Sequence, residues 1–202
     1  MSDTVDATLT PAEAARAVAQ ASRWEDSLIQ RTEGLTAMIW GLVTPAIFVT
    51  YNLASLLDPP DWAYLFWWLP WAIAGNLATF ALWRSAALTS PHLEGEQSWL
   101  RSLIAASAVG LAFLLAFIVL TPTQDAIGLV VVGAGWLILG FVNPFHQSRR
   151  GCRVMGFSGA AILASGLILA ALTPAAGVGL IVAIATTGIL PLTGGLWQTI
   201  QG

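Results

Sequence analysis

Six long apolar runs follow one another along the chain, and short polar or proline-containing stretches separate them. Each run has about 20 residues, the length that an α-helix needs to cross a hydrocarbon core of about 30 Å at about 1.5 Å per residue. We therefore predict an all-α fold, a polytopic membrane protein built as a six-transmembrane-helix bundle. The predicted spans cover approximately residues 35–57, 62–83, 102–120, 126–145, 154–172 and 177–200.

A hydrophilic segment, residues 1–33, precedes the first apolar run. Thr10 and Glu13 fit a capping box, and Pro11 suits the first position of a helix, so we predict a helix from Pro11 to about Arg31. Its weak apolar stripe and Trp24 indicate an amphipathic helix that lies on the membrane surface or packs against a partner. The chain thus divides into a cytoplasmic N-terminal segment, residues 1–33, and a transmembrane domain, residues 34–202.

Composition supports a chain that lies mostly in lipid. Hydrophobic residues make up 56% of the sequence and charged residues only 9%, whereas about 25% of an average soluble domain is charged. The ten tryptophans suit the headgroup region, where a ring with one N–H donor meets a mixed environment. The acidic net charge of −3 argues against a nucleic-acid partner, which would require a basic face.

The basic residues are all arginines, and they occur only in alternate hydrophilic segments. They precede the first run or lie in the second and fourth connections: Arg16, Arg23, Arg31, Arg84, Arg101, Arg149, Arg150 and Arg153. Because arginine-rich segments stay in the cytoplasm, we predict a multi-pass protein of the cell membrane with both termini cytoplasmic. Arg149, Arg150 and Arg153 form a short basic cluster that suits anionic lipid headgroups or a docking protein.

No acidic or basic side chain lies in the middle of a predicted span. Ion-coupled pumps, proton relays and intramembrane proteases need such groups at membrane depth, so we predict that the chain is not an enzyme and holds no cofactor or metal. One question stays open in the predicted loops, where five residues could coordinate zinc but follow no standard spacing. These residues are His92, Glu94, Glu96, His146 and Cys152.

Neutral polar groups and helix breakers remain as candidates for a solute path. Asn76 and Thr79 share one face of the second span, and residues 188–195 form the strongest predicted helix break, through Gly188, Pro191, Gly194 and Gly195. Interrupted helices build the binding sites of many transporters. The alternative is that these residues serve ordinary interhelical hydrogen bonding and close packing. Small residues at four-residue spacing, such as Ala74 with Ala78 and Ala160 with Ala164, also indicate close helix packing.

Two classes of function follow. The favoured one is a non-enzymatic structural or accessory subunit in the lipid bilayer, which forms a homo-oligomer or assembles with other membrane subunits, with a cytoplasmic protein as a further candidate partner. The alternative is a transport component. A surface helix, six spans and a polar loop after the second span resemble the layout of the membrane subunit of an ABC-type exporter, although no residue motif carries this resemblance. A passive channel for neutral solutes belongs to the same alternative.

Overall fold

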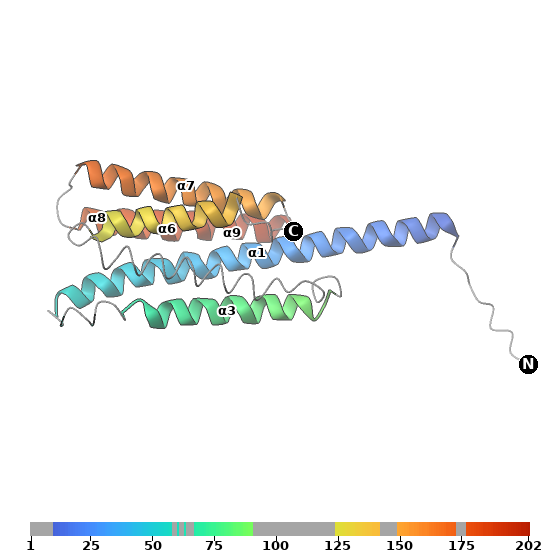
Figure 1. Cartoon of the computed structure of the whole chain (residues 1–202). Helices are drawn as coiled ribbons and strands as arrows, with labels where there is room; N and C mark the ends of the chain where they lie inside the picture. Colours follow the sequence, from blue (N-terminus) through green and yellow to red (C-terminus); the bar gives the residue numbers. More distant parts are fainter. Residues whose placement is uncertain are drawn as a thin grey trace, which may run out of the picture.

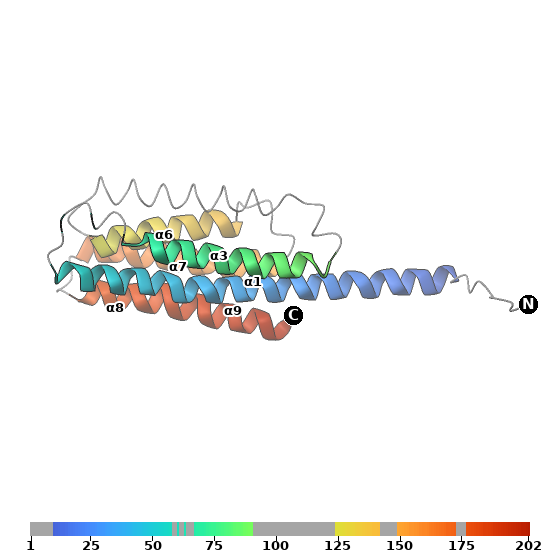
Figure 2. The same cartoon turned by 90° about the horizontal axis from the view of Figure 1, so that it is seen from below.

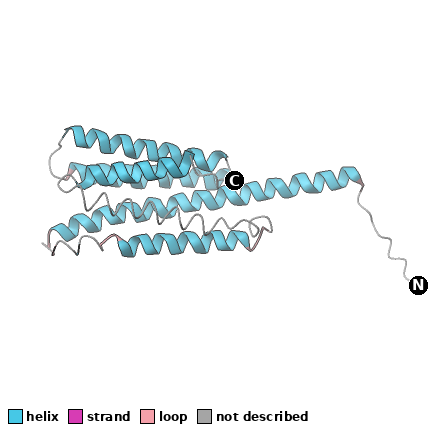
Figure 3. Ribbon diagram, in the orientation of Figure 1, coloured by secondary structure: helices cyan, strands magenta, loops and turns pink. Residues whose placement is uncertain are grey.

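The computed structural model describes residues 10–57, 60, 63, 67–90, 124–141, 149–172 and 177–202. All regular structure within these residues is helical (Figure 3). The helices are α1 (Pro11–Ser55), α3 (Leu69–Ala87), α6 (Gln124–Phe141), α7 (Arg149–Leu172), α8 (Val178–Ile184), the π-helix η1 (Ala185–Ile189) and α9 (Leu190–Gln201). Because α8, η1 and α9 follow one another without a gap, the described residues form five separate helical segments.

The predicted all-helical class is confirmed, but the count of six spans is not supported. Within the described residues, three helices are long and apolar enough to cross a membrane: α1 up to Ala54, Val154–Leu172 in α7, and Val178–Gln201. The described apolar part of α6, Ala126–Leu137, is shorter. The predicted third span, residues 102–120, lies outside the described residues.

The course of α1 corrects the prediction of a separate N-terminal helix. Its start is confirmed, because Glu13 N donates to Thr10 Oγ1 at 3.3 Å and Thr10 N donates to Glu13 Oε2 at 2.9 Å. Its predicted end near Arg31 is wrong, since α1 continues without a break for 45 residues, or roughly 68 Å. No proline or turn sequence interrupts the chain between Arg31 and Thr44, and each of the two glycines there, Gly34 and Gly41, costs a helix only about 1 kcal/mol.

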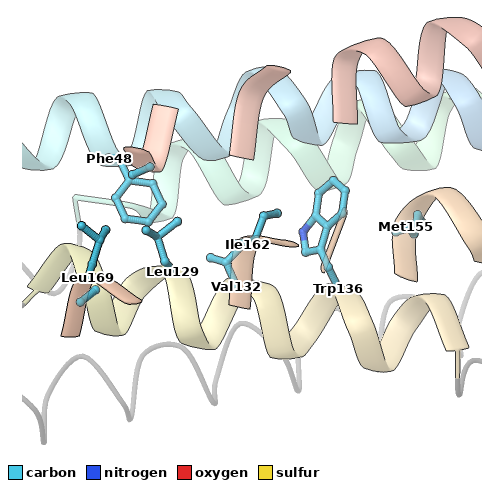
Figure 4. Close-up of a cluster of buried hydrophobic side chains, with 9 residues drawn as sticks. Phe48, Leu129, Val132, Trp136, Met155, Ile162 and Leu169 are labelled. Atoms are coloured by element: carbon cyan, nitrogen blue, oxygen red, sulfur yellow. The ribbon is translucent and has the colours of Figure 1, made fainter. Parts of the chain in front are cut away.

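The helices pack side by side around α1 (Figures 1 and 2). α1 lies between α3 and the α8–η1–α9 segment, while α6 packs along α7, and α7 in turn contacts α9. Figure 4 shows the buried cluster that joins α1 to α6 and α7. Phe48 from α1 lies near Leu129 of α6, and the cluster continues along the bundle through Val132 and Trp136 of α6 and Ile162 of α7. One core therefore joins α1 to helices that follow it by more than 65 positions in the sequence.

Glycine, rather than alanine, forms the closest helix contact. A Cβ atom on Gly133 of α6 would lie 2.6 Å from the Cα atom of Leu163, and one on Gly166 of α7 would lie 2.8 Å from the carbonyl oxygen of Ala126. The backbones of α6 and α7 can therefore approach to a distance that any larger residue would prevent, which increases their dispersion contacts. Of the predicted alanine faces, Ala164 in α7 and Ala74 in α3 are exposed in the single chain.

Candidate functional site

The N-terminal part of α1 extends beyond the other helices (Figure 1). We call residues 11–24 the helical arm. The end of the bundle from which this arm projects is called the arm end. None of the arm residues is buried, and Val18 and Trp24 are 70% and 53% exposed. An isolated helix of this length is marginal in water, so the arm depends on its cap and on its continuity with the packed part of α1.

The cap at Thr10 supports the free end of the arm. Hydrogen bonds from the backbone N–H and the hydroxyl of Thr10 to the Glu13 carboxylate, at 2.9 and 2.8 Å, lower the pKa of Glu13 below its ordinary value of 4.5. Both bonds favour the ionised form. A negative charge in the first turn also complements the positive end of the helix dipole.

A buried polar pair lies where α1 enters the bundle. Glu33 of α1 and Gln198 of α9 are only 2% and 1% exposed, and Gln198 Nε2 donates to Glu33 Oε2 at 3.0 Å. Neither was among the predicted site residues, because Glu33 was assigned to the water-facing segment. One signal could have found Glu33: the sequence from Arg31 to Thr44 contains no helix-breaking proline, so the first span could extend backward past it.

Further polar contacts hold the same part of α1 to α3 and α9. Trp83 Nε1 donates to Thr36 Oγ1 at 3.1 Å, Ser90 Oγ donates to the carboxylate of Glu25, and Ser27 Oγ donates to the backbone oxygen of Gly202. Together with the buried pair they form what we call the basal cluster. Its members are Glu25, Ser27, Glu33, Thr36, Trp83, Ser90, Gln198 and Gly202.

Two glycines bring α1 and α9 together beside the basal cluster. A Cβ atom on Gly34 would lie 2.5 Å from Thr199 Oγ1 and 2.6 Å from the carbonyl oxygen of Gly195. A Cβ atom on Gly195 would likewise collide with the carbonyl oxygen of Gly34. Real Cβ atoms do not approach other heavy atoms this closely, so the contact requires glycine on both helices. The basal cluster and this glycine contact fix α1 to α3 and α9 at the base of the arm, where α1 enters the bundle.

In the described structure, residues 188–195, which we predicted to interrupt the helix, stay helical but follow a change from α- to π-helix. The chain remains helical from Val178 to Gln201, and a π-helix, Ala185–Ile189, precedes the buried Pro191. Proline has no N–H to donate, and its ring would collide with the carbonyl of residue 187 in a regular α-helix. The wider turn of a π-helix accommodates this conflict without unwinding. The hydroxyl of Thr187, which is fully buried, donates to the Ala183 carbonyl at 2.6 Å.

The two parts of the predicted solute path do not meet in the described structure. Asn76 Nδ2 donates to the Ala72 carbonyl of its own helix at 2.8 Å, and Thr79 Oγ1 is buried without a hydrogen-bond partner among the described residues. Because α1 lies between α3 and α9 (Figures 1 and 2), it separates this face from Gly188 and Pro191.

The glycines of the predicted break contact neighbouring helices instead. A Cβ atom on Gly188 would lie 3.0 Å from Pro45 Cγ of α1, and one on Gly194 would lie 2.6 Å from Val154 Cγ1 of α7. Gly195, as described above, faces Gly34. In the described structure these glycines therefore serve helix packing, which was the alternative interpretation of the sequence pattern.

The predicted docking residues occupy two places at the arm end. Trp24 is exposed at the base of the arm. Arg149, Arg150 and Arg153 lie in the first turns of α7, which begins at Arg149, and the apolar part of that helix, Val154–Leu172, matches the predicted span. Both α3, which carries Arg84 in its last turn, and α7 have these ends at the arm end of the bundle (Figure 1).

The zinc question stays open. His92, Glu94, Glu96 and His146 lie outside the described residues, and Cys152 lies in α7. Within the part of the chain that the structure describes, no three His, Cys, Asp or Glu residues are grouped closely enough to hold a metal ion.

Fold and site together define an all-helical protein with three helices that could cross a membrane and one helix that extends far beyond the bundle. No protein-family model, no curated protein and no solved structure matches the chain. Any function must therefore be inferred from the helices and contacts described above.

Proposed function

We propose that this chain is a non-enzymatic, multi-pass membrane protein whose bundle anchors a rigid cytoplasmic helical arm, to which a partner subunit binds. One observation carries this proposal: α1 continues unbroken from the packed core at Phe48 to the exposed arm. A helix that only anchored the chain would not need about four exposed turns beyond the bundle. The basal cluster fixes the arm to α3 and α9, as a docking element requires.

The membrane topology belongs to the same proposal. We place six spans in the bilayer, with both termini in the cytoplasm, because all eight arginines fall in segments predicted to share one side. The arrangement of the helices supports this orientation. The arm, the end of α3 with Arg84, and the start of α7 with its three arginines lie at the same end of the bundle.

The arm offers a mixed surface suited to another helix. Val18 and Trp24 supply exposed apolar area, while Arg16, Arg23 and Asp26 are exposed on the same helix. Apolar anchors set among charged residues are typical of helix-to-helix recognition. The partner on this view is another membrane subunit, a second copy of the chain or a cytoplasmic protein.

The transport alternative receives less support. An elbow helix of an exporter lies across the membrane surface and turns into the first span, whereas the arm and α1 are one helix. The segment expected to interrupt the sixth span stays helical, with Gly188 and Gly195 packed on α1. No described feature specifically favours a channel or an exporter over an assembly subunit.

The test combines flux and crosslinking. The purified chain in liposomes is expected to pass neutral solutes no faster than protein-free liposomes do. A photoreactive residue at Val18 is expected to give one discrete adduct in native membranes. The matched control is the same residue at Leu53, which is 56% exposed at the other end of α1 and is expected not to give that adduct. Saturable flux by the purified chain, or absence of an adduct from both Val18 and Trp24, would contradict the proposal.

A further inference from the structure

A groove of about 600 Å³ runs between α7 and α9. Its walls repeat at three- and four-residue steps on both helices, so the groove follows the helix axes. Along α9 it covers about 16 Å. The lining residues are Val154, Phe157, Ser158 and Ala161 of α7 and Leu190, Thr193, Gly194, Trp197 and Gln201 of α9.

The floor of the groove is a close helix contact. A Cβ atom on Gly194 would lie 2.6 Å from Val154 Cγ1, so α7 and α9 touch where the glycine leaves space. Larger side chains stand on either side of this contact, and Phe157 and Trp197 are 67% and 52% exposed. The result is a mostly apolar groove, which suits a hydrocarbon chain.

The polarity of the lining changes along the groove. Leu190 and Ala161 line its deeper part, whereas Trp197 and Gln201 lie toward the arm end. Tryptophan favours the headgroup level, where an apolar ring with one N–H donor meets water and lipid. A lipid whose chain pointed toward Leu190 would therefore place its headgroup near Gln201.

Positive charge lies at that same end. α7 begins at Arg149 and has Arg149, Arg150 and Arg153 in its first turns, with no acidic residue in the first turn. Arg150 precedes the groove residue Val154 by four positions, or about one helical turn. The free N–H groups of a helix start also attract anions, and α9 contains no ionisable residue that would oppose one.

We propose that the groove binds one acyl chain of an anionic phospholipid, with its phosphate at the first turns of α7. The proposal rests on the membrane location given under Proposed function but not on the arm or its partner. Charge complementarity selects the occupant, because each basic side chain near an anionic headgroup adds about fivefold to binding. A zwitterionic lipid would fill the same groove without this gain.

The test is native mass spectrometry of the full chain, purified in detergent and supplied with phosphatidylglycerol or phosphatidylcholine of identical chains. The expected result is at least about fivefold greater retention of phosphatidylglycerol. Ala161→Phe should fill the groove and reduce that retention several-fold, whereas Ala164→Phe, at an exposed position of α7 outside the lining, should not. Arg150→Gln should lower retention about fivefold, and Arg84→Gln on α3 should leave it unchanged.

Three outcomes would overturn the proposal. Equal retention of the two lipids would show that the headgroup is not recognised. Unchanged retention in both Ala161→Phe and Thr193→Phe, which alter opposite walls, would show that the groove is not the site; the second variant also serves if the first does not fold. Loss of an oligomer in these variants, without loss of lipid, would assign the groove to a second copy of the chain. None of these outcomes bears on crosslinking from Val18, so the two proposals fail separately.

Discussion

Gln198, near the end of α9, donates a hydrogen bond to Glu33 of α1 across 3.0 Å, although 165 positions separate the two residues in the chain. Both side chains are almost completely buried. A polar group in such a place costs free energy unless its hydrogen bonds are made. The pair therefore makes the docking of α9 on α1 specific, at the point where the arm leaves the bundle.

Removing the donor from this pair is expected to destabilise the protein. Gln198→Leu takes one hydrogen bond from a buried carboxyl group, and we expect a loss of about 1–3 kcal/mol in the free energy of unfolding. Glu33→Leu combined with Gln198→Leu should recover much of that loss, because neither member of the pair then leaves the other buried without its hydrogen bond. Unfolding in mixed detergent micelles, arranged as a double-mutant cycle, measures both effects.

The matched control for this pair is Gln201→Leu. Gln201 is exposed and lies three residues further along α9, so its replacement should change the unfolding free energy by less than about 0.5 kcal/mol. Strictly additive effects at Glu33 and Gln198 would show that the hydrogen bond does not couple the two helices.

The contact between Gly34 and Gly195 predicts a second, steric effect. Gly195→Ala would drive a Cβ atom into the carbonyl oxygen of Gly34, and backbone atoms cannot move aside as a flexible side chain can. We expect a loss of about 1–3 kcal/mol, as in other overpacked sites, measured in the same unfolding experiment.

Gly75→Ala provides the comparison. The nearest atoms to a Cβ there are the methyl groups of Val43, at 3.3 Å, which small shifts of the side chain can relieve. The gain in helix propensity, about 1 kcal/mol, should offset the remaining strain. Equal destabilisation by the two substitutions would contradict the special closeness of α1 and α9.

The parts of the fold that sequence predicts well are those that local chemistry determines. Thr10, Pro11 and Glu13 lie within four residues, and the cap that they form depends on no other part of the chain. The apolar runs likewise predict helices, because an apolar environment leaves a backbone few other ways to pair its N–H and C=O groups.

Other features depend on residues far away in the sequence. Glu33 looks water-facing until Gln198 and Gly195 are known to pack beside it. Pro191 suggests a break until η1 provides a wider turn in front of it and α1 places Pro45 against Gly188. Periodicity and composition contain no information about such partners, so the basal cluster could not be predicted. The length of α1 had one signal in the sequence, the absence of proline between Arg31 and Thr44.

Acid is expected to weaken the free end of the arm. The pKa of Glu13 is lowered from 4.5 by its hydrogen bonds with Thr10, so the ionised carboxylate stabilises the folded cap. This contribution is complete above the unfolded pKa and is lost as the pH falls through the lowered, folded pKa. A carbon-13 NMR titration of the Glu13 carboxyl group should have its midpoint below 4.5.

Thr10→Ala is the control for this titration. It removes the hydroxyl donor and weakens the cap, so the midpoint should return toward 4.5 and the first turn of α1 should fray. A midpoint in the parent chain at or above that of Thr10→Ala would mean that the cap does not form in solution.

The last prediction follows from the continuity of α1. Spin labels at Val18 and Leu53, both exposed, are separated by 35 residues, which corresponds to about 52 Å in one straight helix. With Cys152 replaced by serine, pulsed electron paramagnetic resonance of the chain in nanodiscs should give a narrow distribution of distances near this value.

Labels at Leu35 and Leu53 provide the control. These two residues lie within one helix whether or not the arm continues α1, so their labels should be about 27 Å apart. Arg31→Pro should shorten and broaden only the longer distance, because proline breaks the helix at the base of the arm. A short distance in the parent chain, together with protection of the Val18 label from water-soluble relaxation agents, would place residues 11–24 on the membrane surface and remove the basis for a projecting arm.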